Sequence, residues 1–255
     1  MDRVKRLIKA GFSVVGLDVS IARTPKTVEY VSRQKVDLLL DVGANAGQYA
    51  LAARKAGFAN TIVSFEPLPD CHASLIELAR GDPKWIIHER CALGAFIGAA
   101  EINIAKNSYS SSLLPMLPAH QEAAPESTYA ARASTKVVTL DSIFGAYYRE
   151  GASVFLKIDT QGFESQVLGG AQYCLPLIGA VQLELSVLPL YESQELYDYF
   201  FDLFRANGFM LWSIIPGFTE PRTGQMLQFD AIFVRPNGAT LALTPALGRP
   251  TAVTD

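Results

Sequence analysis

The feature that most constrains this chain is an apolar run that ends in an acidic turn bracketed by glycines, LLLDVGANAG at residues 38–47. The three leucines before Asp41 are apolar in succession, as in a strand that helices cover on both faces. Gly43 and Gly47 bracket the turn, and Asn45 between them is one of the few other residues that tolerate left-handed backbone angles. Because a helical pattern follows, the segment predicts a strand, a tight turn that binds a ligand, and a helix.

An acidic residue ends the next predicted strand, TIVSFEP at residues 61–67. Glu66 follows Asp41 by 25 residues, and an acid at this place accepts hydrogen bonds from the hydroxyls of a ribose. The turn and Glu66 together therefore predict a pocket for an adenosine-containing cofactor. The turn has GxxxG where a dinucleotide site has GxGxxG, and glycine turns after buried strands also serve purely structural roles. The turn alone leaves that alternative open.

Strands and helices alternate along the chain, which predicts an α/β fold with a parallel, doubly wound sheet. Right-handed crossovers would place Gly43, Glu66 and the turn at Cys91 and Ala92 on one carboxyl edge, where ligands bind. The last two apolar segments, 208–218 and 225–236, have no helical pattern between them and are expected to pair antiparallel. Strands are expected at 36–42, 61–65, 85–88, 99–106, 136–140, 154–158 and 180–186, and helices from 47 and at 69–80, 141–150, 164–169 and 192–207.

The chain divides into three parts. Residues 1–35 are expected to be a lead-in helix and a polar linker with helical potential, 36–236 the α/β domain, and 237–255 a tail without pattern. Val4, Leu7, Ile8 and Phe12 share one helical face, which indicates an amphipathic helix that packs on the protein or a partner, with contact to a membrane surface or a cleaved signal as alternatives. Residues 105–134 are rich in Ser, Pro and Ala and are expected to be a long insertion loop, with one short helix, that recognises the substrate.

Three charged residues lie in or directly after apolar strands late in the domain. Lys157 stands near the end of the apolar strand VFLKI, and buried lysines are rare unless paired. It therefore forms a salt bridge, for which Glu184 between Leu183 and Leu185 is a candidate partner, or it aligns a cofactor or an acceptor. Asp159 lies at the end of the same strand. A divalent metal held by Asp159 and Glu184 at adjacent strand ends is an alternative, but no ligand cluster of characteristic spacing supports it, and no metal is expected.

Composition excludes several classes of protein. A net charge of −3, spread along the chain, does not favour broad binding to nucleic acids. Three widely separated cysteines, Cys71, Cys91 and Cys174, fit neither a disulfide framework nor a metal cluster. The reducing cytoplasm is therefore the expected compartment.

Seven short motifs, spread over residues 36–235, resemble in content and order those of the FkbM family of S-adenosylmethionine-dependent methyltransferases. They are DVGANAGQYA, FEP at 65–67, CALG at 91–94, SSSL at 110–113, VTLDS at 138–142, LKIDTQGFE at 156–164 and LELSVLPLYE at 183–192. The resemblance implies a class I methyltransferase fold, Rossmann-like, with a doubly wound seven-stranded sheet and a C-terminal antiparallel hairpin. It also implies that S-adenosylmethionine is the cofactor.

The resemblance further assigns roles to residues. It implies that Asp41, Gly43, Ala44, Asn45 and Gly47 hold the methionine end of the cofactor, that Glu66 and Pro67 lie at the ribose, and that Cys91, Ala92 and Leu93 lie at the adenine. Asp159 and Lys157 would lie beside the methyl group and the acceptor.

Members of the family that this chain resembles methylate hydroxyl oxygens, often on sugars of glycans and glycolipids or on secondary metabolites, which implies a small-molecule or glycan acceptor. A hydroxyl is a poor nucleophile until its proton leaves, so a general base helps. Asp159 is the first candidate base, Glu184 the second and His120 in the insertion a third. A methyltransferase-like protein that binds without catalysis, and a nicotinamide-dependent oxidoreductase, are the rival hypotheses. The missing GxGxxG and the charge of Asp41 argue against the oxidoreductase.

Overall fold

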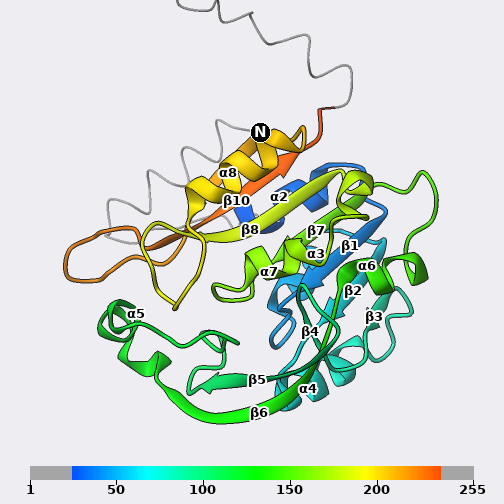
Figure 1. The fold of residues 1–255 in the computed structure, drawn as a ribbon. Helices are drawn as coiled ribbons and strands as arrows, with labels where there is room; N and C mark the ends of the chain where they lie inside the picture. Colours follow the sequence, from blue (N-terminus) through cyan, green and yellow to red (C-terminus); the bar gives the residue numbers. More distant parts are fainter. Residues whose placement is uncertain (1–24, 237–255) are drawn as a thin grey trace, which may run out of the picture.

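The structure is a computed structural model in which residues 25–236 are described. Its core is a seven-stranded sheet with the order β3-β2-β1-β7-β8-β10-β9 (Figure 1). The first five strands in that order, β3, β2, β1, β7 and β8, run parallel, whereas β10 is antiparallel to both β8 and β9. This confirms the α/β fold, the seven strands and the antiparallel C-terminal pair. The strands are β1 (Leu38–Val42), β2 (Thr61–Phe65), β3 (Trp85–Ile87), β7 (Val154–Ile158), β8 (Ala180–Ser186), β9 (Met210–Pro216) and β10 (Gln228–Val234).

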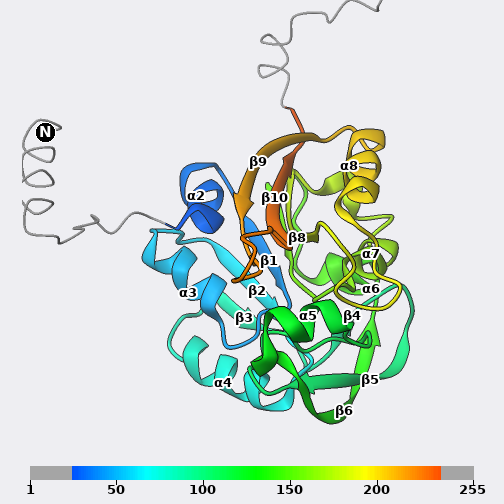
Figure 2. The same ribbon diagram turned by 90° about the vertical axis from the view of Figure 1, so that its left-hand side faces the viewer.

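Helices cover both faces of the sheet (Figure 2). Helices α2 (Lys26–Arg33), α3 (Gln48–Lys55) and α4 (Pro69–Ala79) pack on one face, and α6 (Leu140–Ile143), α7 (Glu164–Gly169) and α8 (Tyr197–Ala206) on the other. Successive side chains of β1 point to opposite faces, so Leu38 and Leu40 enter one hydrophobic cluster and Leu39 the other. This is why the strand is apolar at each position before Asp41. None of the helices in the described part is long and apolar enough to cross a bilayer.

The segment expected to be a polar linker contains helix α2, which is part of the packed core. Val28 and Val31 are buried, and the ring of Tyr30 stacks on Phe155 of β7 with centroids 5.4 Å apart. The lead-in helix expected within residues 1–24 and the tail at 237–255 lie outside the described residues.

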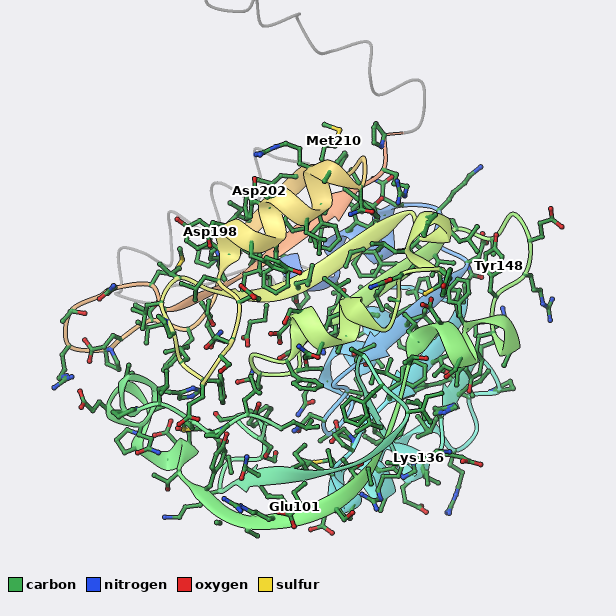
Figure 3. The ribbon with its side chains drawn as sticks, viewed as in Figure 1. Glu101, Lys136, Tyr148, Asp198, Asp202 and Met210 are labelled. Carbon is green, nitrogen blue, oxygen red and sulfur yellow. The ribbon has the colours of Figure 1, made fainter. Side chains whose placement is uncertain are left out.

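The last residues of the expected insertion loop belong to a second sheet, which has three strands in the order β4-β6-β5. Its strands are β4 (Ala92–Leu93), β5 (Gly98–Ala105) and β6 (Tyr129–Val138), and α5 (Pro118–Ala123) and the 3₁₀ turn η1 (Pro125–Ser127) lie in the connection. Figure 3 shows Glu101 of β5 and Lys136 of β6 on the outside of this sheet. Residues 129–134 are therefore strand and not loop. Most of their side chains are exposed, so the segment has no apolar alternation to reveal it.

Two helices differ from the expected bounds. The one expected at 141–150 is the short α6 followed by the 3₁₀ turn η2 (Phe144–Ala146), and its N-cap is Thr139, whose Oγ1 accepts from the Ser142 backbone N–H at 3.2 Å. Asp141, the first residue of the expected helix, accepts from the backbone N–H groups of Tyr173 and Cys174, just before the turn η3 (Leu175–Leu177).

The helix expected from residue 192 begins only at Tyr197. The side chain of Gln194 accepts from the backbone N–H groups of Leu190 and Tyr191, which holds this stretch in a turn. Beyond it α8 is amphipathic, with Phe200 and Phe204 buried and Asp198 and Asp202 on its outer face (Figure 3).

Candidate active site

A cavity of about 450 Å³ opens at the carboxyl ends of the parallel strands. Its volume lies in the range of small-molecule sites. Apart from His120, thirteen site residues are expected from the sequence, and eleven of them line the cavity: Gly43, Ala44, Asn45, Glu66, Pro67, Cys91, Ala92, Leu93, Lys157, Asp159 and Glu184. The other two, Asp41 and Gly47, lie behind the lining. Residues 108–113 of the insertion also contribute to the wall, through Ser108, Tyr109, Ser111, Ser112 and Leu113.

Every backbone N–H group in the loop after β1, residues 43–47, has an acceptor within the protein. Gly43 and Ala44 donate their N–H groups to the Phe65 carbonyl, Ala46 to Asn45 Oδ1 and Gly47 to the Ala44 carbonyl. The Asn45 N–H donates to Glu66 Oε2 at 2.6 Å. Each of the five N–H groups from 43 to 47 therefore already has an acceptor.

Left-handed backbone angles allow this loop. The φ angles of Gly43, Asn45 and Gly47 are 72°, 46° and 83°. A Cβ on Gly43 would collide with the Asp159 carbonyl oxygen, so the loops after β1 and β7 can approach each other only because position 43 is glycine.

Glu66 links the loop after β1 to the loop after β2. Its Oε1 accepts from the Leu68 backbone N–H at 2.8 Å, while Oε2 accepts from Asn45. Burial raises the pKa of Glu66 to about 7, against the opposing effect of these two hydrogen bonds. Each carboxylate oxygen keeps a lone pair, and the side chain lines the cavity.

Lys157 pairs with Asp41. Its Nζ lies 3.2 Å from Asp41 Oδ1 and 3.6 Å from Asp159 Oδ2, and it donates to the Gly43 carbonyl at 2.9 Å. Burial alone would lower the pKa of Lys157, but the charges of Asp41 and Asp159 outweigh burial and raise it above its usual value. The salt bridge expected for Lys157 is therefore present.

The expectation that Glu184 is the partner of Lys157 was wrong, because no salt bridge or hydrogen bond joins the two side chains. Lys157 lies beside Asp41 in the register of β1 with β7, and beside Gln182 in that of β7 with β8. Glu184 stands two residues further along β8 and instead accepts at Oε2 from Gln161 Nε2 at 2.6 Å and from Gln228 Nε2 at 2.8 Å. Burial, followed by the charges of Asp159 and Asp230, raises the pKa of Glu184 well above its usual value.

Asp159 is the more accessible of the two candidate bases. About 37% of its side chain is exposed, and its Oδ1 accepts from Gln161 Nε2 at 3.0 Å. His120, the third candidate, does not line the cavity. Its buried ring packs against Tyr191 and Phe218 with centroid distances of 5.2 and 5.5 Å, and burial lowers its pKa to about 4.

Sequence reasoning missed Asp230 and Gln161. Asp230 lies opposite Glu184 across β8 and β10, and its Oδ1 accepts from Gln182 Nε2 at 3.0 Å. Burial raises the pKa of Asp230 to about 6. The cavity is thus lined by four carboxylates, Glu66, Asp159, Glu184 and Asp230, and Lys157 is the one basic residue among its described lining.

A comparison with known protein families identifies the class of protein. A family model described as the Methyltransferase FkbM domain matches residues 41–211. No curated protein sequence matches the chain.

Similar solved structures include a putative RNA methyltransferase from Pyrococcus horikoshii, with 11% identity, 83% of each chain covered and a TM-score of 0.45. Another is a putative tRNA (m1A22) methyltransferase from Streptococcus pneumoniae, with 13% identity, 83% of this chain and 70% of that one covered, and a TM-score of 0.46. TehB from Haemophilus influenzae has 9% identity, 89% and 67% coverage, and a TM-score of 0.46. The fold assignment rests on the strand order above and not on these low scores.

Proposed function

The chain belongs to the FkbM family of methyltransferases, and we propose that it transfers the methyl group of S-adenosylmethionine to a hydroxyl oxygen of a neutral, sugar-like small molecule or glycan. The observation that carries this proposal is a loop at 43–47 whose backbone N–H groups all have acceptors, next to a cavity in which carboxylates outnumber cations. The loop indicates the kind of cofactor, and the charges of the cavity indicate the kind of cofactor and the kind of acceptor.

The loop argues against a dinucleotide. A pyrophosphate binds to free backbone N–H groups at such a turn, whereas the N–H groups of residues 43–47 already have acceptors. A doubly negative group would also meet the carboxylates of the cavity at short range. These two features favour a cationic cofactor over NAD.

S-adenosylmethionine supplies a methyl group on a sulfonium, whose positive charge is lost on transfer. We propose that Glu66 binds the ribose hydroxyls, with Pro67 beside it, and that Cys91, Ala92 and Leu93 contact the adenine. Gly43, Ala44 and Asn45 would face the methionine end. Asp41 and Gly47, which lie behind the lining, would act by holding Lys157 and the turn.

Asp159 is the proposed general base. It lines the cavity, and about 37% of its side chain is exposed. Glu184 is more enclosed and already accepts two amide N–H groups at one oxygen. Alignment of the reactants can contribute ~7–11 kcal/mol, and a base a further ~10²–10⁴-fold in rate.

The acceptor is proposed to be uncharged. Phosphate and carboxylate groups would meet Asp159, Glu184 and Asp230, with Lys157 already paired to Asp41. Hydroxyl-bearing side chains of the insertion line the wall, and they suit a polyhydroxylated acceptor: Ser108, Tyr109, Ser111 and Ser112. Nucleic acid is disfavoured for the same reason.

Isothermal titration of the full chain with S-adenosylmethionine, and in parallel with NAD, tests the cofactor. We expect micromolar binding of S-adenosylmethionine and none of NAD; the reverse result, or no binding of either, would sink the proposal. Transfer of labelled methyl groups to a panel of neutral and phosphorylated sugars tests the acceptor. Asp159→Ala should bind the cofactor normally and lose turnover, whereas binding without transfer to any panel member would favour the non-catalytic hypothesis.

A further inference from the structure

The side-chain amide of Gln161 makes three polar contacts around the proposed base. Its Nε2 donates to Asp159 Oδ1 at 3.0 Å and to Glu184 Oε2 at 2.6 Å, and its Oε1 accepts from the Tyr191 hydroxyl at 2.8 Å. Only the NH₂ end of an amide donates, so only one orientation can serve two carboxylates. The Tyr191 hydroxyl completes that orientation by donating to the oxygen.

The backbone at Gln161 is held as firmly as its side chain. Its φ of 56° is left-handed, a conformation that a residue other than glycine keeps only when its surroundings impose it. The Gln161 carbonyl accepts from Ser112 Oγ at 2.7 Å. Glu164 Oε1 accepts from the Thr160 and Gly162 N–H groups on either side, and a Cβ on Gly162 would press on the Tyr191 ring.

Tyr191 provides a rigid support. It is fully buried in a cluster with Met116, Ala123, Leu190 and Leu227, so its ring has no room to turn. Its hydroxyl lies 2.8 Å from Gln161 Oε1 and 3.2 Å from the Ser110 carbonyl. The hydroxyl therefore ties the insertion and the loop after β7 together at one point.

We infer that Gln161 is a positioning residue for methyl transfer, and that Tyr191 fixes its amide so that Asp159 stays aimed into the cavity and apart from Glu184. With one N–H on each carboxylate, the two acids remain separate acceptors and do not share a proton. The inference rests on the proposed function for the reaction that it serves. The contacts that carry it are independent of the cofactor's identity.

Tyr191→Phe is the sharpest test because it keeps the buried ring and removes only the hydroxyl. Tyr129→Phe is the matched control. The Tyr129 hydroxyl donates to the Leu114 carbonyl at 2.7 Å within the insertion and has no hydrogen bond to Gln161. Gln161→Leu removes the amide altogether. All three are made in the full chain and checked for cooperative unfolding.

The first readout is the titration of the Glu184 carboxyl, followed by ¹³C NMR without any substrate. An amide N–H favours the charged form of a carboxylate, so its loss raises the pKa. The charges that face Glu184 are Asp159, Glu164 and Lys157 from the β7–α7 segment and Asp230 from β10, and they are the same in every variant. We expect the midpoint of Glu184 to rise in Tyr191→Phe and Gln161→Leu and to stay in place in Tyr129→Phe.

The second readout is the rate of methyl transfer. We expect kcat to fall about 10- to 100-fold in Tyr191→Phe, with the Kd for S-adenosylmethionine within about twofold of the wild type, and no change in Tyr129→Phe. An unmoved Glu184 midpoint or an unchanged kcat in Tyr191→Phe, or equal effects in Tyr129→Phe, overturns the inference alone. Failure of the wild type to bind S-adenosylmethionine overturns the proposed function, which is a separate result.

Discussion

Lys157 Nζ lies 3.2 Å from Asp41 Oδ1, and Asp41 is fully buried. Removing one member of a buried ion pair leaves the other charge unpaired, which costs ~3–5 kcal/mol. We therefore expect Lys157→Met to lower the free energy of unfolding by that amount in a urea titration.

Two variants serve as controls for this pair. Lys136→Met removes an exposed lysine 3.9 Å from Glu89 and should stay within ~0.5 kcal/mol of the wild type. Asp41→Asn combined with Lys157→Met should recover part of the loss. A double variant no more stable than Lys157→Met would mean that the charge of Asp41 is not the cause.

Gly43 and Gly57 separate backbone strain from steric collision. Both have positive φ, but a Cβ meets nothing within 4 Å at Gly57 and collides with the Asp159 carbonyl at Gly43. We expect Gly57→Ala to lower the free energy of unfolding by ~1–2 kcal/mol from strain alone, and Gly43→Ala to lower it further and to weaken cofactor binding. Thermal unfolding and calorimetry measure the two effects. Equal losses in both variants would show that the two loops can move apart freely.

Glu66 should make cofactor affinity depend on pH. Its pKa is about 7, and the ionised form is the better acceptor for ribose hydroxyls. Affinity for S-adenosylmethionine should therefore fall as the pH drops from 8 to 6. Glu66→Gln should bind at least about tenfold more weakly, with little dependence on pH in this range. Glu77→Gln, on the exposed part of α4, should behave like the wild type; a Glu66→Gln variant that kept the pH dependence would exclude Glu66 as its source.

His120 should make stability depend on pH in acid. Its folded-state pKa is about 4, below the unfolded value of about 6.5, so protons favour the unfolded chain. Its contribution to stability is complete above pH ~6.5 and declines by up to ~1.4 kcal/mol per pH unit toward pH ~4.

The raised pKa values of Glu66 and Glu164, both about 7, act in the opposite direction, because their folded forms gain stability as the pH falls. The comparison is therefore between the wild type and His120→Phe in urea titrations from pH 7 to pH 4.5. The stability of the variant relative to the wild type should rise as the pH falls. Parallel curves would show that His120 is not protonated differently in the two states.

Local patterns were sufficient to predict the elements that bring the loop at residues 43–47 to the cavity. Leu38 to Leu40 are apolar at every position because the strand faces two hydrophobic clusters, and Gly43 and Asn45 take the left-handed angles that their residue types permit. Glu66 lies at the end of its strand, as predicted, and reaches the cavity.

Contacts between distant segments were not predictable in the same way. Lys157 meets Asp41 because of the register between two parallel strands, a relationship that no local pattern encodes. Asp230 reaches the site only because β10 pairs with β8. Gln161 carried a local signal, a polar residue before Gly162 in a turn after a buried strand, but two of its three partners, Glu184 and Tyr191, lie 23 and 30 residues away along the chain.

The position of β10 links assembly of the sheet to completion of the site. This strand follows β8 and β9 along the chain, yet it lies between them in the sheet. During synthesis on the ribosome, β8 keeps an open edge and β9 has no neighbour until residues 228–234 emerge, and an open edge is prone to aggregate. The same strand brings Asp230 to the cavity wall and places Gln228 against Glu184. A nascent chain therefore completes its acidic pocket in the same step that closes its exposed strand edge.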